Sequence, residues 1–143
     1  MARLLVVRQR PDEDDILTRL PGLDDLYVEH ATGAAAGLER LAARPFDALL
    51  LSPASTVDED LDFLQRVRTL RPVIRAIFLA DSATPEAVIA AIRAQVFAVF
   101  TRPFDPAQIA NLVGKAADAD SGVDEPGLFH LITHAFFKAL LFL

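Results

Sequence analysis

Two runs of carboxylates are the residues best suited to bind a divalent cation. Carboxylate oxygens are preferred ligands of Mg²⁺ and Ca²⁺, so two loops could together build a cation site. Acidic residues more often begin helices, because they favour the positive end of the helix dipole and stay in solvent. We expect solvated helix starts here and keep the cation site as the alternative. The runs are Asp12, Glu13, Asp14 and Asp15, and Asp58, Glu59, Asp60 and Asp62.

A second group with regular spacing is His130, His134 and Lys138. Steps of four residues would place the three side chains along one stripe of a helix. Two histidines at this spacing can bind a metal ion, but the sequence around them offers no further ligands. The chain also has no cysteine, which excludes disulfides, thiolate metal sites and cysteine catalysis. We therefore expect no metal site and no cofactor.

Short apolar runs alternate with longer stretches of helical periodicity along the chain. The runs predict five strands, and the last of them, 96–101, is followed by a helix with Asp105 as its cap and Pro106 in its first turn. A continuous apolar run such as 46–52 is typical of a strand covered on both faces. The predicted strands are 4–7, 26–31, 46–52, 73–80 and 96–101. The other predicted helices are 12–20, 34–43, 61–70 and 85–93, and the inward stripe of the third is Leu61, Phe63, Leu64, Val67 and Leu70.

This alternation predicts an α/β fold with a parallel sheet, helices on both of its faces and right-handed crossovers. In such folds ligands bind at the carboxyl ends of the strands. The residues expected at that edge are Arg8, Gln9, Ser52, Ala80, Asp81 and Arg102. They include a single carboxylate, so this edge does not have the composition of a metal site.

Residues 3–117 resemble the receiver domain of bacterial two-component response regulators, the CheY-like domain. The resemblance implies a flavodoxin-like, doubly wound sheet of five strands. It also implies a place in a phosphorelay, in which an aspartate at the end of the third strand accepts a phosphoryl group from a histidine kinase. The stretches that carry it are "LLVV", "TGAAAGLERLAARPFDALLLS", "LDFLQRVRTLRP", "IFLAD" and "FTRPFDPAQI".

Each reactive position of that family is changed in this chain. The acidic pair after the first strand falls on Arg8 and Gln9, and the phosphoacceptor falls on Ser52. The hydroxyl residue after the fourth strand falls on Ala80, and the lysine falls on Arg102. If Arg8 pointed inward, it would repel a divalent cation 4 Å away by roughly 8 kcal/mol at an effective dielectric constant of 20. The sequence thus predicts a receiver scaffold that is not an enzyme and is not phosphorylated on aspartate.

Two further positions bear on how such a domain would signal. The family's switch aromatic, which lies three residues before the lysine, falls on Val99, so the switch residue is absent. Arg102-Pro103 resembles the family's cis peptide, and an X-Pro bond is held cis at a cost of only about 0.5–1 kcal/mol.

The C-terminal part differs in composition from the rest of the chain. Residues 118–127 are small, acidic and interrupted by Gly and Pro, which predicts a flexible linker. Residues 128–143, "LFHLITHAFFKALLFL", carry one formal charge and would form a helix of roughly 24 Å, too short to span a bilayer alone. Three interpretations stay open: a helix that packs on the body or on a second copy, an interfacial membrane helix, and a metal site.

The same segment resembles the histidine and lysine segment of the antiporter-like, proton-translocating subunit of NADH-quinone oxidoreductase. That resemblance covers residues 128–143 only, and His130, His134 and Lys138 lack the surrounding bundle that proton transfer needs. It leaves an alternative function, a membrane-associated or fused fragment related to that subunit.

Composition sets the remaining limits. A formal net charge of −6 argues against nucleic-acid binding, which needs basic surface. The apolar run at 4–7 is too short for a signal peptide, so we expect the cytoplasm, with membrane contact through 128–143 left open. We predict a receiver-like domain at 1–117, a linker at 118–127 and a helical tail at 128–143. Its partners would be signalling proteins, with a homodimer left open.

Overall fold

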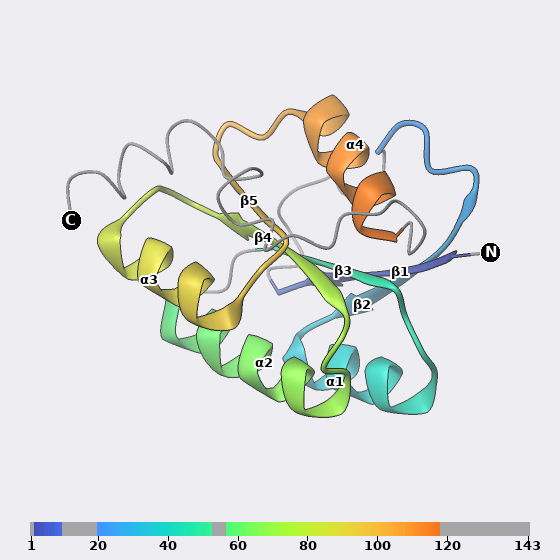
Figure 1. Ribbon diagram of the computed structural model, residues 1–143, viewed down its shortest axis with the longest axis horizontal. Coiled ribbons are helices and arrows are strands. Elements are labelled where there is room, and N and C mark those ends of the chain that lie inside the picture. Colours follow the sequence, from blue (N-terminus) through green and yellow to red (C-terminus); the bar gives the residue numbers. More distant parts are fainter. Residues whose placement is uncertain (1, 10–19, 53–56, 118–143) are drawn as a thin grey trace.

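A computed structural model describes residues 2–9, 20–52 and 57–117 of the chain (Figure 1). Its centre is a five-stranded sheet in which each neighbouring pair of strands is parallel. The strands are β1 (Ala2–Arg8), β2 (Leu26–Thr32), β3 (Ala48–Leu51), β4 (Arg75–Ala80) and β5 (Ala98–Thr101). Their order across the sheet is β2-β1-β3-β4-β5, which is the order of flavodoxin-like proteins.

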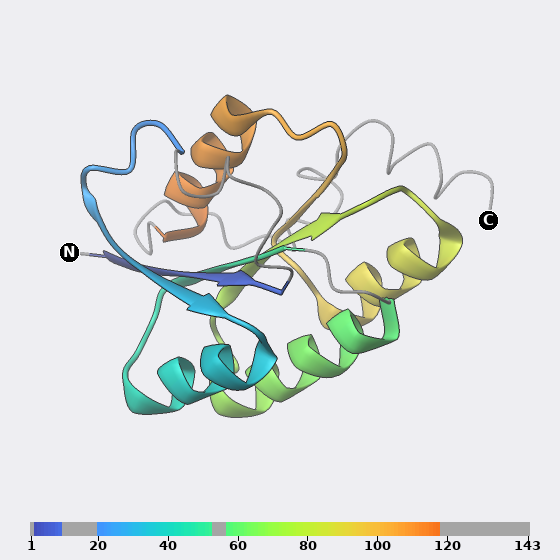
Figure 2. The same ribbon diagram turned by 180° about the vertical axis from the view of Figure 1, so that it is seen from behind.

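Four helices are described, and they cover both faces of the sheet (Figures 1 and 2). Three lie on one face and α4 lies on the other, so the sheet is the middle layer of three. The helices are α1 (Ala34–Ala43), α2 (Val57–Leu70), α3 (Pro85–Ala94) and α4 (Pro106–Ala117).

The core is divided by the sheet because successive strand side chains point to opposite faces. Leu5 and Val7 of β1 are buried on the face of α1, α2 and α3, while Leu4 and Val6 are buried on the face of α4. The inner strands β1, β3 and β4 are therefore apolar almost throughout, as expected for strands covered on both sides.

The predicted architecture is confirmed where the structure describes it. The five predicted strands are present, and the predicted helices at 34–43, 85–93 and from Pro106 correspond to α1, α3 and α4. Asp105 caps α4 through a hydrogen bond of 2.9 Å from the amide of Ala107. Residues 10–19 lie outside the described residues, and with them most of the predicted first helix.

One predicted stripe is partly wrong. On α2, Phe63, Leu64 and Val67 are buried as expected, but Leu70 is exposed at the end of the helix. The buried face continues toward the start of the helix and includes Asp60. The buried face of α2 therefore consists of Asp60, Phe63, Leu64 and Val67. These residues lie on one side of the helix because they are spaced three and four residues apart.

Candidate functional site

The ends of β1 and β3 lie side by side at the carboxyl edge of the sheet, which we call the strand-end edge. The amide of Ser52 donates to the carbonyl oxygen of Val7 at 3.0 Å and continues the pairing of the two strands. One residue further, the amide of Gln9 donates to Oγ of Ser52 at 2.9 Å. Gln9 and Ser52, which the sequence places at this edge, are thus in direct contact.

The side chain of Gln9 joins a third residue to this pair. Its Nε2 donates to Oδ1 of Asp60 at 2.6 Å, and it also lies 3.4 Å from the carbonyl oxygen of Ser52. Asp60 comes from the first turn of α2, where its carboxylate lies near the positive end of the helix dipole. Asp60 is 3% exposed and Ser52 is 2% exposed, so these two members of the cluster of Gln9, Ser52 and Asp60 are buried, while Gln9 is half-buried.

Sequence reasoning treated Asp60 as one member of a solvated acidic run, and for this residue that prediction is wrong. Asp58, Glu59 and Asp62 are exposed as expected, whereas Asp60 faces the sheet. The sequence did contain a signal, since Asp60 lies three residues before Phe63 and four before Leu64, both of which are buried. A carboxylate on the buried stripe of a helix needs a hydrogen-bond donor, and Gln9 is one.

Arg8 makes the electrostatic potential of this edge more positive. The pKa of His30 is lowered, first by burial and then by the positive charge of Arg8. His30 lies on β2, the strand paired with β1. A guanidinium that repels the imidazolium form of His30 would also repel a metal cation.

The β4 and β5 ends carry a different set of contacts. Ala80 is buried and offers no side-chain hydrogen bond. Arg102 lies beside Asp81, with 2.9 Å between Nε and Oδ1, and its guanidinium stacks 4.8 Å from the centre of the Phe104 ring. The Arg102-Pro103 peptide bond is cis. Because both partners of the ion pair are partly exposed, we expect it to add only about 0–1 kcal/mol to stability.

Val99 is fully buried in the core between the sheet and helices α1, α2 and α3. A valine side chain has one torsion angle and no ring, so it cannot swing from the core to the surface as a large aromatic can. The structure thus gives Val99 a packing role.

The arrangement offers little chemistry. Within the described ranges 2–9, 20–52 and 57–117, no group of three or more His, Cys, Asp or Glu could hold a metal ion. In the same ranges, the hydrogen bond to the Ser52 side chain comes from an amide, which cannot take up the hydroxyl proton. An activated serine needs an adjacent base. Cluster geometry favours a structural role for Gln9, Ser52 and Asp60.

Several predicted residues lie outside the part of the chain that the structure describes. These include the acidic run at 12–15, the linker and the tail with His130, His134 and Lys138. In the described part, no helix combines the length and the apolar character that crossing a membrane requires.

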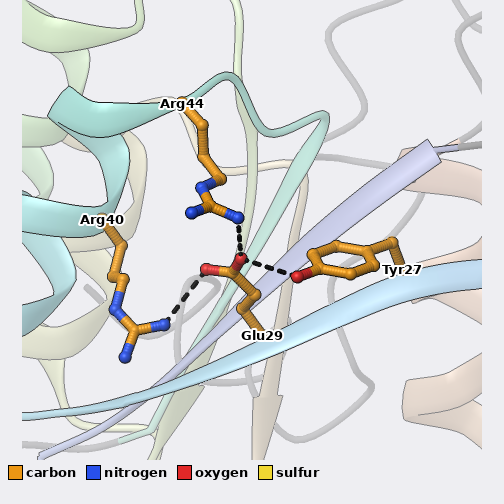
Figure 3. A network of polar contacts seen from close by, with 4 residues as sticks. All are labelled: Tyr27, Glu29, Arg40 and Arg44. Carbon is orange, nitrogen blue, oxygen red and sulfur yellow. Dashed lines mark hydrogen bonds and ion pairs between the residues drawn. The ribbon is translucent and has the colours of Figure 1, made fainter.

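A second buried polar group lies away from the strand-end edge (Figure 3). Glu29 of β2 is 8% exposed and accepts hydrogen bonds from Tyr27 Oη at 3.0 Å, Arg40 Nη1 at 3.2 Å and Arg44 Nη1 at 2.6 Å. Burial alone would raise the pKa of Glu29, but these hydrogen bonds and the two positive charges outweigh it and lower the pKa. Sequence reasoning did not single out this group, which fixes the edge strand to α1.

Comparison with known proteins agrees with the architecture. No protein-family model matches the chain, and no curated protein sequence matches it. Solved structures do match. A CheY-like response regulator receiver domain protein from Methanospirillum hungatei has a TM-score of 0.71 and 21% identity, with 82% of this chain and 94% of that chain covered. The chain has the fold of CheY-like receiver domains.

Two other solved structures are also similar to this chain. A putative pilus assembly-related protein from Burkholderia pseudomallei has a TM-score of 0.68 and 24% identity, over 82% of this chain and 90% of that one. A response regulator from the same organism, with a phosphorylated aspartic acid and a calcium ion, has a TM-score of 0.65 and 16% identity, over 85% and 69% of the two chains. Identities this low show the fold alone.

Proposed function

We propose that this chain is an atypical receiver domain that acts by binding protein partners in a signalling pathway, without phosphorylation of an aspartate. In this proposal it is a binding module of the cytoplasm, and it is not an enzyme. The fold shared with response regulator receiver domains supports a signalling role. The chemistry of the strand-end edge supports the loss of phosphotransfer.

One observation carries the proposal, namely the cluster in which the half-buried Gln9 contacts the buried Ser52 and Asp60. A phosphoacceptor carboxylate must be reachable by the donor and must lie beside a cation that neutralises the incoming phosphoryl oxygens. Here Ser52 follows β3, and its neighbour Gln9, which follows β1, supplies a side-chain amide in place of a carboxylate. The carboxylate of Asp60 is buried and accepts a hydrogen bond from that amide.

The charge near the site also supports the proposal. Arg8 ends β1, and its charge is felt by His30 on the adjacent strand. Arg102, which stands where the family has lysine, pairs with Asp81 and stacks on Phe104. The charge of Arg8 therefore acts against a bound divalent cation, whereas the charge of Arg102 is largely offset by Asp81.

The test is to incubate the purified full chain with Mg²⁺ and a small phosphodonor such as acetyl phosphate, and to measure its intact mass. A response regulator that is known to accept phosphate from the same donor, run in parallel, shows that the reaction works. The proposal predicts no added phosphoryl group. A base-labile phosphoryl adduct on a carboxylate would disprove it.

For partner binding we propose the face formed by α3, β5 and α4. The supporting observation is that Ile89 and Ile92, one turn apart on α3, are both exposed. Photo-crosslinking residues placed at these two positions in cells should capture one specific protein. The same photo-crosslinking residue in place of Gln65, which is exposed on α2, should not capture that protein. Equal capture at both sites would argue against this face.

A further inference from the structure

Arg68 lies in the last turn of α2, and its guanidinium group contacts the end of the neighbouring helix, α3. The two helices pack side by side on one face of the sheet (Figures 1 and 2). Nε of Arg68 donates to the carbonyl oxygen of Ala94 at 3.3 Å, and Nη2 donates to that of Gln95 at 2.9 Å. Ala94 is the last residue of α3, and Gln95 is its cap with a left-handed backbone at φ 52°. The last carbonyl groups of a helix have no donor within the helix, so Arg68 supplies donors that the end of α3 needs.

The same guanidinium group also holds the loop between α2 and β4. Nη1 donates to the carbonyl oxygen of Pro72 at 3.3 Å and to that of Ile74. Both acceptors precede Arg75, where β4 begins. One side chain therefore joins the end of α2, the loop that follows it and the end of α3. A guanidinium group can do this because its five N–H donors are held in a planar fork.

Backbone dipoles balance the charge of Arg68. The side chain is half-buried, and burial lowers its pKa. Its four acceptors are carbonyl oxygens, and two of them lie at the negative end of the α3 dipole. Arg66, two residues earlier, differs in both respects, because it is 65% exposed and pairs with Asp62 of its own helix at 3.1 Å. The contacts of Arg66 thus stay within α2, whereas those of Arg68 connect α2 with other segments.

The buried face of α3 consists mostly of alanine. Its buried residues are Ala87, Val88, Ala90, Ala91 and Ala94. Alanine removes little apolar area from water, and its side chain is too short to interlock with a neighbouring helix. Apolar packing therefore fixes the position of α3 less firmly than that of α2, whose buried face holds Phe63, Leu64 and Val67. Polar contacts at the end of α3 have a correspondingly larger part in placing this helix.

Both segments that Arg68 joins expose apolar side chains. Ile89 and Ile92 of α3 are 42% and 39% exposed, and Val73 of the loop is 91% exposed. Ile92 lies two residues before Ala94, whose carbonyl oxygen Arg68 binds. Val73 lies between the two loop residues whose carbonyl oxygens Arg68 binds. A shift of the helix end or of the loop would therefore move these exposed side chains.

We propose that Arg68 is a positioning residue of the partner face, because it holds the end of α3 and the loop between α2 and β4 in one arrangement that a protein partner meets preformed. The apolar residues placed in this way are Ile89, Ile92 and Val73. This inference rests on the partner face proposed above and adds the loop to it. A partner that binds a preformed surface avoids the entropic cost of ordering that surface. Without Arg68, the partner would have to order both segments on binding, and its affinity would fall.

The first measurement is amide hydrogen exchange of the full chain, which needs no partner. Arg68→Lys keeps the positive charge but replaces the planar fork of donors by a single nitrogen atom. The control Arg66→Lys makes the same substitution two residues away, at an exposed ion pair. The reporter amides are those of Ile74, Gln95 and Val96, and the reference is that of Arg44 after the end of α1; each donates to a backbone carbonyl oxygen.

We expect the reporter amides to exchange about tenfold faster in Arg68→Lys and at the wild-type rate in Arg66→Lys. The reference amide should keep its rate in both variants. Unchanged reporter rates in Arg68→Lys would overturn the proposal, because a positive charge alone would then hold the helix end. Equal acceleration of the reference amide would also overturn it, since the substitution would have lowered the stability of the whole domain.

The second measurement is capture of the partner by a photo-crosslinking residue at Ile89 in cells, with Arg68 intact or substituted. We expect Arg68→Lys to reduce this capture at least about threefold and Arg66→Lys to leave it unchanged. Faster exchange with undiminished capture would overturn the positioning role. If Arg68 is intact and nothing is captured at Ile89 or Ile92, the partner face itself is wrong, whatever the exchange rates show.

Discussion

At the scale of single residues, Gln9 connects the ends of β1 and β3 with the first turn of α2. Its amide contacts the Ser52 hydroxyl at the end of β3, and its side chain contacts Asp60 in the first turn of α2. A buried carboxylate is costly unless donors surround it, and a hydrogen bond to a charged group contributes about 1.5–3 kcal/mol. Gln9 thereby stabilises the buried carboxylate of Asp60.

Replacing Gln9 by leucine removes the donor and keeps a side chain of similar size. We expect Gln9→Leu to lower the free energy of unfolding by about 1–3 kcal/mol, because Asp60 loses one hydrogen bond in a buried place. Urea denaturation measures this. Gln65→Leu, at an exposed position of α2, is the control and should change stability by less than about 0.5 kcal/mol. Equal effects of the two substitutions would contradict the role given to Gln9.

Prediction from sequence was uneven at this scale. The residues at the ends of β1 and β3 could be placed, because strand ends follow from apolar runs and parallel strands end at one edge. The contact of Gln9 with Asp60 could not be predicted, because a run of four acidic residues is expected to be solvated unless each residue is assigned to a side of its helix. Glu29 was missed for a related reason, since its partners Arg40 and Arg44 lie on another element and only the packing of α1 on β2 brings them together.

At the scale of elements, the group around Glu29 fixes an edge strand to its helix. β2 pairs with another strand on one side only. Arg40 and Arg44, at the end of α1, form ion pairs with the carboxylate of Glu29 on this strand (Figure 3). Tyr27 completes the group and also stacks under Arg3 at 5.2 Å, which links β2 to β1. Placing charged groups on an edge strand also hinders pairing with other chains.

The lowered pKa of Glu29 makes this contact dependent on pH. Its stabilisation is present in full above the ordinary pKa of 4.5 and is lost as the pH falls through the lower pKa of the folded state. We expect Glu29→Gln to cost about 1–3 kcal/mol at pH 7, and the difference from the wild type to shrink as the pH falls below that ordinary value. Urea denaturation across this pH range tests it, with the exposed Glu39→Gln as control. A difference that does not change with pH would contradict the assignment.

Two helix glycines show how closely α1 and α4 approach their neighbours. A Cβ on Gly37 of α1 would lie 2.9 Å from Cγ2 of Val7 and 3.2 Å from Cζ of Phe63, both in the core. A Cβ on Gly114 of α4 would meet nothing within 4 Å. α1 therefore lies against β1 at a distance that only glycine allows.

Alanine at these two positions should have opposite effects. Gly114→Ala should raise the free energy of unfolding by about 0.5–1 kcal/mol, because alanine favours the helix. Gly37→Ala gains the same preference but overpacks the core at a cost of about 1–3 kcal/mol, so we expect no net gain and most often a loss. Thermal or urea unfolding of both variants decides it. A stabilised Gly37→Ala protein would show that α1 can move away from β1 freely.

Elements were predicted better than contacts, for a physical reason. Helices at 34–43 and 85–93 and the cap at Asp105 follow from local periodicity and capping, which depend on neighbouring residues only. The prediction that Leu70 faces inward was wrong because α2 ends there and the chain turns toward β4, which leaves the last turn in solvent. The predicted stripe was right only where the helix lies on the sheet.

At the scale of the whole molecule, the edge where the strands end and the edge where they begin differ in the residues that they carry. At the strand-end edge, where proteins of this fold bind ligands, the half-buried Gln9 contacts the buried Ser52 and Asp60. The opposite edge, where the strands begin, carries the exposed Val73 in the loop between Arg71 and Arg75. Neither property follows from strand order or helix number. The sequence indicated the first through substitutions at strand ends, whereas the second appeared only once the loop between α2 and β4 was placed.

The central claim is that the receiver fold is kept while its phosphoryl chemistry is lost. The most direct test is amide NMR of the full chain titrated with Mg²⁺ and then with beryllium fluoride, which mimics a phosphoryl group on a carboxylate. Our account predicts that the amide signals of Gln9, Ser52 and Thr101 do not shift beyond the effect of salt alone. Saturable shifts at these residues, dependent on both reagents, would show a working acceptor site and would contradict the account.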